Sequence, residues 1–298
     1  MVPSLPLPLR LVRNLLQRLN YHFSPPPGPG STEQFDAGKV KVFEDALRQL
    51  PGEDDNGRAY LEKHLSRLAR TLAMVPQPGP TSRALELGCY MHITPLLQSI
   101  CGYAHVRGAY YGQAGEVERK TIRVPDGEYT CEIDLFNVEK DRFPYPDEHF
   151  DLVIAGEIIE HLIYDPMHML LEARRVLADG GFLLITTPNV GSITTVARAL
   201  YGGGNPQIFS LYSRGSGEVG HVREYTLHEL GKTVHAAGFE VATLFTTFIE
   251  EFEVYRPLLK FLKENGYDTE HRGEQTWCLA RKRADLPVDR YPRIIYSA

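Results

Sequence analysis

Two acidic residues and two histidines are placed where they could form one chemical centre. Residues 157–161 read Glu-Ile-Ile-Glu-His, and His221 follows further along the chain. On a helical turn, residues three and four apart are neighbours, so Glu157, Glu160 and His161 are expected on one face. Carboxylates and imidazoles suit Mg²⁺, Mn²⁺ or Zn²⁺, and His221 would add a fourth ligand. Without a metal, His161 or His221 is the best general base near neutral pH.

These residues need elements that hold them, and after residue 82 apolar strands alternate with helices. Helices are expected to begin at Thr94, at Asp165 and, through a capping box, at Thr226. The pattern predicts an α/β fold, a doubly wound, mostly parallel seven-stranded sheet. In such a sheet the ligand lies beyond the carboxyl ends of the strands, which is where Glu157 stands. The predicted strands cover residues 84–87, 104–111, 129–135, 151–155, 182–187, 239–245 and 275–280.

Acidic residues also close the first and third of these strands. Glu86 and Gly88 end the first, where glycine permits a tight turn and a carboxylate suits an amine or a hydroxyl. A phosphate would be repelled there. The absence of a Walker lysine and of G-x-G-x-x-G also argues against a nucleoside triphosphate or a dinucleotide. Asp134 and Leu135 end the third strand, where an acid can accept from an exocyclic amino group while apolar atoms cover a ring.

Short motifs follow one another in a recognisable order. They are LELG at 85–88, Asp134-Leu135, the run 150–162, EARRVL at 172–177 with the glycines at 180–181, TPN at 187–189 and HVREYT at 221–226. Over about residues 82–282 this order resembles the class I S-adenosylmethionine-dependent methyltransferases, which implies a Rossmann-like fold and S-adenosylmethionine as cofactor. By the same resemblance, Glu86 and Gly88 face the methionine amino group, and Asp134 takes the adenine amino group with Leu135 beside the ring. Glu157 then follows the strand next to the sulfonium.

Two positions depart from the family pattern. The first loop of the family carries two or three glycines, whereas this chain has Tyr90 and His92. The second strand of the family ends in an acid that holds the ribose hydroxyls, whereas this one ends in Tyr110. We therefore place Tyr90 and Tyr110 against the cofactor, with Gln113 or Glu116 as substitutes for the acid. The departures leave open a catalytically inert relative that binds without methylating.

The cluster of acids and histidines suggests the acceptor atom. E-x-x-E-H with a later histidine is similar to the metal site of small-RNA 2′-O-methyltransferases and of metal-dependent O-methyltransferases of ubiquinone synthesis, which implies an oxygen acceptor. A hydroxyl is a very weak acid and needs a base or a Lewis acid. We expect methylation of a hydroxyl on a small molecule, a saccharide or a glycosylated metabolite, assisted by Mg²⁺ or Mn²⁺. The alternative enzyme, an RNA 2′-O-methyltransferase, is disfavoured by the net charge of −6.

The composition and the segments rich in proline and glycine predict the domains and the cellular setting. Four scattered cysteines without a CxxC pair favour a reducing cytoplasm, and no apolar run is long enough for a transmembrane segment.

A basic amphipathic helix within 9–23 could touch a membrane surface, or pack on its own domain or on a second subunit in a homo-oligomer. A glycine-rich loop, 201–217, is a candidate lid. The expected units are 1–30 (amphipathic helix and proline-rich linker), 31–80 (helical cap), 81–285 (cofactor-binding domain) and 286–298 (tail).

Overall fold

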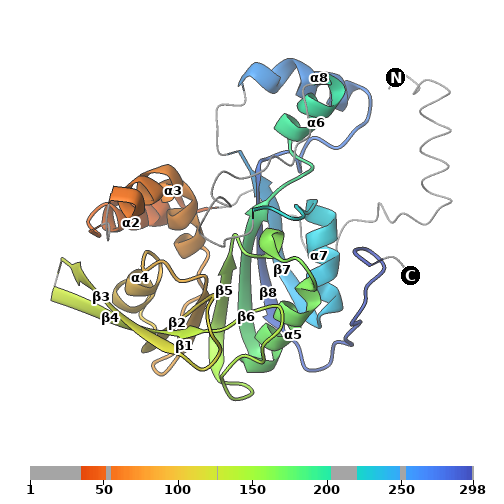
Figure 1. Ribbon diagram of the computed structural model, residues 1–298. Helices are drawn as coiled ribbons and strands as arrows, with labels where there is room; N and C mark the ends of the chain where they lie inside the picture. The colour runs from red at the N-terminus through yellow and green to blue at the C-terminus, as the bar shows by residue number, and fades with distance from the viewer. Residues whose placement is uncertain (1–34, 52–54, 126, 203–219, 249–252, 297–298) are drawn as a thin grey trace.

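A mixed sheet with helices on both faces forms the centre of the molecule (Figure 1). The computed structural model describes residues 35–51, 55–125, 127–202, 220–248 and 253–296. Its eight strands run in the order β3-β4-β2-β1-β5-β6-β8-β7. In chain order they are β1 (Arg83–Leu87), β2 (His105–Tyr110), β3 (Val117–Val124), β4 (Gly127–Leu135), β5 (Phe150–Gly156), β6 (Leu177–Pro188), β7 (Phe239–Thr247) and β8 (Gln275–Lys282).

The predicted fold class is confirmed, and the structure adds one strand. β4, β2, β1, β5 and β6 pair in parallel, while β8 is antiparallel to both of its neighbours. The additional strand is β3, which forms an antiparallel hairpin with β4 at the edge of the sheet. β3 is largely exposed and four of its eight residues are charged, so it lacks the apolar signal that identified the buried strands.

Side chains of each central strand alternate between two hydrophobic cores. Leu85, Leu87 and Val153 point into a core that contains residues of α5 (Pro166–Val176) and α7 (Leu227–Ala236). Ala84 and Leu152 point into the opposite core. That second core contains buried residues of α2 (Ala37–Leu47), α3 (Asp55–Ala73) and α4 (Thr94–Ser99). Successive side chains of a strand point to opposite faces of the sheet, so each strand contributes to both cores. The amino-terminal helices therefore share the second core with the sheet.

Local capping explains where the helices begin. Asp165 caps α5 by accepting from the Met167 amide at 3.1 Å, as predicted. The capping box of α7 between Thr226 and Glu229 is also confirmed. α4 differs, because Ile93 is its capping residue and Thr94 is already helical, with Pro95 in the first turn. The remaining helices are α6 (Ile193–Leu200) and α8 (Arg256–Glu264).

Two predicted features, the amphipathic helix and the glycine-rich loop, lie partly or wholly outside the residues that the structure describes. The segment 1–30, with its amphipathic helix at 9–23, lies outside the described residues, and so does most of the glycine-rich loop 201–217. Among the described helices, none has the length and apolar character to cross a membrane.

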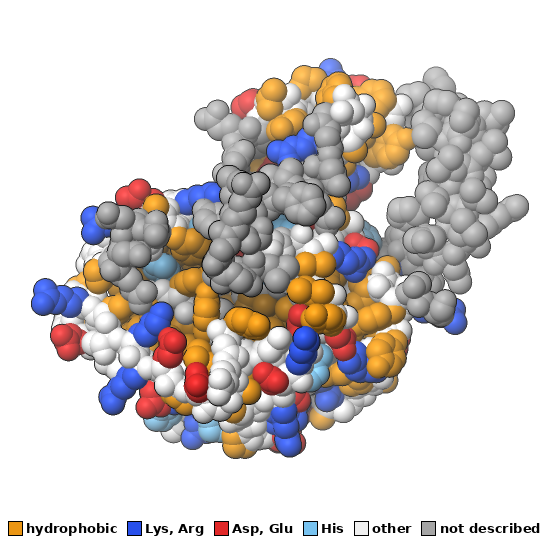
Figure 2. Space-filling model, in the orientation of Figure 1, with side chains coloured by type: hydrophobic (Ala, Val, Ile, Leu, Met, Phe, Trp, Pro, Cys, Tyr) orange, Lys and Arg blue, Asp and Glu red, His pale blue; other side chains and the backbone are white. Residues whose placement is uncertain are grey.

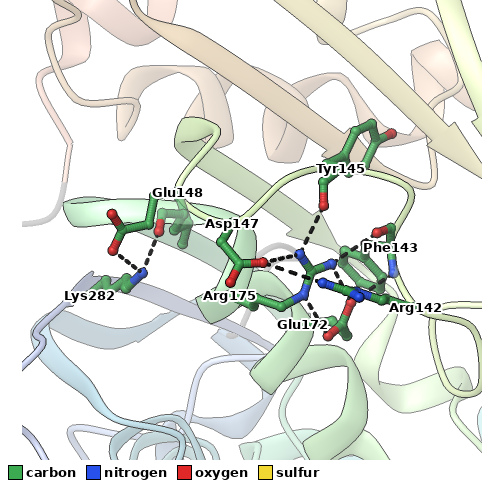
Figure 3. Close-up of polar contacts among 9 residues, drawn as sticks. Arg142, Phe143, Tyr145, Asp147, Glu148, Glu172, Arg175 and Lys282 are labelled. Carbon is green, nitrogen blue, oxygen red and sulfur yellow. Dashed lines mark hydrogen bonds and ion pairs between the residues drawn. The ribbon is translucent and has the colours of Figure 1, made fainter.

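Arg175 ties α5 to the segment that leads into β5 (Figure 3). Its guanidinium donates to the Glu172 carboxylate at 2.7 and 2.9 Å and to Asp147 at 2.7 Å. It also donates to the backbone oxygens of Tyr145 and Phe143, each at 2.9 Å. The side chain is only 17% exposed, so water could not readily replace the partners of its donors.

We expect Arg175→Ala to lower the free energy of unfolding by about 3 kcal/mol, because it removes the cation from a half-buried carboxylate, which keeps the Phe143 amide as a donor, and removes the donor of two backbone carbonyls. Urea denaturation measures this loss. Arg142→Ala is the control, since the Arg142 side chain is 75% exposed and lies 3.6 Å from the same Asp147. Equal stability of the two variants would contradict the role given to Arg175.

Candidate active site

The turn after β5 decides which of the predicted residues meet. Glu157 has φ of +54°, in the left-handed region, and residues Ile159–His161 form a 3₁₀ turn. The predicted α-helical turn is therefore wrong, and Glu157 is not among the described residues whose ligand atoms cluster. Its carboxylate instead accepts from Thr186 Oγ1 and from Gln275 Nε2, both at 2.8 Å. We accordingly remove Glu157 from the expected metal ligands.

Glu160, His161 and His221 do come together. One ligand atom from each lies within 4.8 Å of the other two. The His161 and His221 rings are 4.9 Å apart at 79°, and His161 Nε2 lies 3.9 Å from Glu160 Oε1. The Glu160 carbonyl accepts from the amides of Val222 and Arg223, which brings the segment carrying His221 against the turn. Three of the four predicted ligands thus form one cluster beyond the carboxyl end of β5.

The Glu160 carboxyl is fully buried and only half satisfied. Oε2 accepts from Thr187 Oγ1 at 2.9 Å, whereas Oε1 finds no hydrogen-bond partner among the described residues. Burial, followed by the nearby Glu157 charge, raises the pKa of Glu160 well above its usual range. An unsatisfied carboxyl oxygen next to two imidazoles fits a divalent cation, because ionisation of Glu160 then gains a counter-charge.

The structure adds a residue that orients His221. Glu224 Oε1 lies 2.8 Å from His221 Nδ1. The carboxylate accepts, so Nδ1 carries the proton and Nε2 is left as the basic or metal-binding atom. Glu224 is part of the HVREYT motif, and the spacing of three residues was the sequence signal for this contact.

The loop after β1 offers a second unsatisfied carboxyl. Gly88 has φ of +69°, and a Cβ there would lie 3.2 Å from Ile158 Cδ1. Glu86 is buried, and its Oε2 has no hydrogen-bond partner within the described part of the chain. Burial, with a smaller contribution from Cys131, raises the pKa of Glu86 from 4.5 to about 8. A cationic amine fits this place, since it would supply the missing donor and favour the ionised carboxylate.

The raised pKa of Glu86 makes stability depend on pH. A carboxyl that binds its proton more tightly when folded stabilises the protein fully below about pH 4.5, and this contribution is lost as pH rises to about 8. In the absence of ligand, we expect Glu86→Gln to flatten the fall in melting temperature between pH 5 and 8. Calorimetric scans over that range measure it, with the exposed Glu118→Gln as control. Parallel curves for wild type and Glu86→Gln would contradict the assignment.

Asp134, predicted to meet an adenine amino group, is already bound by side chains of the protein. Arg107 donates to its two oxygens at 2.6 and 2.9 Å, and the Tyr145 hydroxyl donates at 2.7 Å. The carboxylate is buried at the carboxyl end of β4, next to Leu135, which is also buried. A carboxylate offers about four acceptor positions, so one is left for a ligand.

Tyrosines occupy the place where the family has glycine and an acid. The Tyr110 hydroxyl donates to the Tyr90 hydroxyl at 3.0 Å, and the two rings are 5.3 Å apart. The structure thus brings Tyr90 and Tyr110 together at the ends of β1 and β2. Gln113 and Glu116, suggested as substitutes for the acid, are exposed.

Helix α3 contributes residues that the sequence did not single out. Tyr60 stacks on His92 with centroids 5.7 Å apart and lies 5.4 Å from the Tyr90 ring. Arg67 donates to the Tyr60 hydroxyl at 3.1 Å, and its guanidinium is 4.0 Å from Glu157 Oε1. α3 therefore places the Tyr60 ring against the loop after β1 and the buried Arg67 cation beside Glu157, after β5. Tyr60 and Arg67 are seven residues apart and so lie on one side of the helix, which was the sequence signal for their joint position. The leucines of α3 already accounted for the helix, so these two residues were not singled out.

Comparisons with known proteins identify the family to which this fold belongs. A family model described as a methyltransferase domain matches residues 56–244, more than half of the chain. The chain is 30% identical over 159 residues to 27-O-demethylrifamycin SV methyltransferase of Amycolatopsis mediterranei, covering 49% of this chain and 58% of the relative. It is 26% identical over 163 residues to ubiquinone biosynthesis O-methyltransferase of Parvibaculum lavamentivorans, covering 54% and 62%. The matched stretches span less than two thirds of either relative.

The chain is also similar to a solved structure, at lower sequence identity. The S-adenosylmethionine-dependent methyltransferase of Archaeoglobus fulgidus is 16% identical, with a TM-score of 0.47, and the match covers 83% of this chain and all of that one. The sheet with helices on both faces, matched by a family model of a methyltransferase domain, defines a protein of the methyltransferase fold. The family match then settles the class: the chain belongs to the class I S-adenosylmethionine-dependent methyltransferases, as its motifs predicted.

Proposed function

We propose that the protein transfers the methyl group of S-adenosylmethionine to a hydroxyl of a small molecule, and that Glu160, His161 and His221 activate that hydroxyl. The observation that carries the proposal is the cluster of these three side chains around an unsatisfied, buried carboxyl oxygen. Both relatives described above are named for methylation of small molecules, and the ubiquinone enzyme is named an O-methyltransferase, which supports an oxygen acceptor. A saccharide acceptor stays a prediction.

S-adenosylmethionine supplies a methyl group on a sulfonium, which is already a good leaving group, so the protein mainly aligns donor and acceptor. In our proposal Glu86 accepts from the methionine amino group and Asp134 uses its remaining acceptor position for the adenine amino group. Tyr90 and Tyr110 lie against the nucleoside, and Glu157 lies near the sulfonium.

The three clustered residues handle the acceptor proton. Glu224 holds the proton of His221 on Nδ1, so Nε2 can accept a proton from the hydroxyl or bind a cation. We propose that Glu160 Oε1, His161 and His221 hold Mg²⁺ or Mn²⁺, which would lower the pKa of a bound hydroxyl. Because the buried Glu160 carboxyl must lose its proton first, metal affinity should rise with pH.

Mn²⁺ binding followed by electron paramagnetic resonance tests the metal site without knowledge of the acceptor. We expect one bound Mn²⁺ per chain, tighter binding at pH 8 than at pH 6, and loss of binding in Glu160→Gln and His221→Ala. His228→Ala is the control, because the His228 ring contacts the His271 ring and His228 is not one of the three clustered residues. Undiminished binding in Glu160→Gln would place the ion outside this cluster, and absence of binding at millimolar Mn²⁺ would remove the metal. Either result would leave His221 as the candidate general base.

A further inference from the structure

Arg67 is a cation inside the fold whose hydrogen-bonding capacity the chain leaves largely unused. Acidic and basic side chains stand side by side over the outer surface (Figure 2), whereas Arg67 is only 8% exposed. A guanidinium has five N–H donors, and within the described residues its one hydrogen bond runs from Nη2 to the Tyr60 hydroxyl, at 3.1 Å. Because buried charges are normally paired and hydrogen-bonded, the remaining donors of Arg67 are suited to an anion.

Glu157, which forms an ion pair with Arg67, does not fill these donors. Its Oε1 lies 4.0 Å from Arg67 Nη1, beyond hydrogen-bonding distance, and already accepts from Thr186 and Gln275 at 2.8 Å. In the proposed function the sulfonium also lies near Glu157, so one carboxylate would serve two positive charges. A second anionic group beside Arg67 would balance the charge when the cofactor is bound.

The side of α3 that carries Arg67 is turned toward the candidate active site. Tyr60, His64 and Arg67 are four and three residues apart and so lie on one side of the helix. The Tyr60 ring contacts the rings of Tyr90 and His92 in the loop after β1. Burial, followed by the charge of Arg67, lowers the pKa of His64 to about 4, so His64 is neutral near pH 7 and Arg67 is the charged member of the three.

The electrostatic partners of Arg67 distinguish two possible sources of an anion. Arg67 interacts with the charges of Glu157 and Glu160, which follow β5 on the acceptor side of the site. Among the described residues, the groups that shift the pKa of Glu86 do not include Arg67. The ammonium and the carboxylate of S-adenosylmethionine share one carbon, so a residue that binds the cofactor carboxylate should lie next to Glu86. These relations favour the acceptor as the source.

We therefore propose that Arg67 binds a carboxylate of the acceptor, which fits the planar fork of a guanidinium. The inference rests on the proposed function and narrows its acceptor to a hydroxylated acid, a class that includes acidic saccharides and excludes neutral ones. Tyr60 and His64 then belong to the wall that the acceptor contacts, and α3 is the element that selects the acceptor by charge.

Calorimetric titration of the full-length chain separates the two sources of a carboxylate. We expect Arg67→Gln to bind S-adenosylhomocysteine, and 5′-methylthioadenosine, which lacks the amino and carboxyl groups, as tightly as the wild type does. With S-adenosylhomocysteine saturating, glucuronate and mandelate should bind the wild type about tenfold more tightly than their neutral amides. Arg67→Gln should abolish this preference, and Arg67→Lys, which keeps the charge without the fork, should retain part of it.

Arg70→Gln is the matched control, because it removes a cation one turn further along α3. Arg70 donates to the backbone oxygen of Phe248 and lies over the Phe35 ring, so its loss should leave the preference for acids unchanged. Circular dichroism and melting temperatures check the fold of each variant. The comparison of acids with amides in the wild type needs no variant, so it tests the proposal even where Arg67→Gln is unstable.

Three results would overturn the proposal. They are binding of the acids no tighter than that of the amides by the wild type, an undiminished preference in Arg67→Gln, and a selective loss of affinity for S-adenosylhomocysteine in Arg67→Gln. The last result would assign Arg67 to the cofactor carboxylate. Failure of the proposed function is a separate outcome, since the wild type would then not bind S-adenosylhomocysteine at all.

Discussion

His161→Ala is expected to lower kcat by about 10² to 10⁴-fold while the protein still binds S-adenosylhomocysteine with unchanged affinity. The reason is the position of the side chain, 37% exposed and beside Glu160 Oε1, where it can reach an acceptor hydroxyl or a cation. Initial rates of methyl transfer give kcat, and calorimetric titration gives the affinity.

His228→Ala is the control for the loss of a histidine elsewhere in the same domain, and it should keep wild-type rates. Full activity of His161→Ala would remove the cluster from the chemistry. Loss of affinity for S-adenosylhomocysteine together with loss of activity would assign His161 to the cofactor site.

Asp134→Asn is expected to weaken binding of S-adenosylhomocysteine by about tenfold or more and to lower the free energy of unfolding by about 2 kcal/mol. Both effects follow from one carboxylate, which accepts from Arg107 and Tyr145 and has one position left for the ligand. Titration calorimetry and urea denaturation measure the two effects on the same preparation.

Glu132→Gln provides the comparison for Asp134→Asn. Glu132 also pairs with Arg107, but its side chain is 51% exposed, so its loss should change neither quantity appreciably. A destabilised Asp134→Asn with unchanged affinity would confine Asp134 to a structural role and leave the adenine amino group to another residue.

Strands and helix caps could be predicted because their signals are local. All seven predicted strands are present, and the signal is strongest in β1 and β5, which are almost entirely buried. β2 and β4 carry exposed polar residues, but each contains enough buried apolar residues to be recognised. Asp165 and Thr226 were recognised as caps because a cap depends on residues within one turn. The strand ends then placed Glu86, Asp134 and Glu160 correctly along one edge of the sheet.

Features that depend on tertiary contacts could not be predicted in the same way. Glu157 adopts a positive φ, and its carboxylate is bonded by Thr186 and by Gln275 of the distant β8, which no pattern within 157–161 reveals. Arg67 of α3 lies beside Glu157, a contact between segments far apart in the sequence that no local pattern reveals. The edge strand β3 was not predicted, because a largely exposed strand does not require a run of apolar residues.

Calorimetric titration of the full-length protein with S-adenosylhomocysteine is the most direct test of the central claim, that the strand-end carboxylates form a cofactor site. We expect saturable binding of one ligand per chain, a rise in melting temperature as the ligand exceeds its Kd, and weaker binding by Glu86→Gln. A protein that is folded, yet gives neither heat nor a thermal shift at millimolar ligand, would contradict the account.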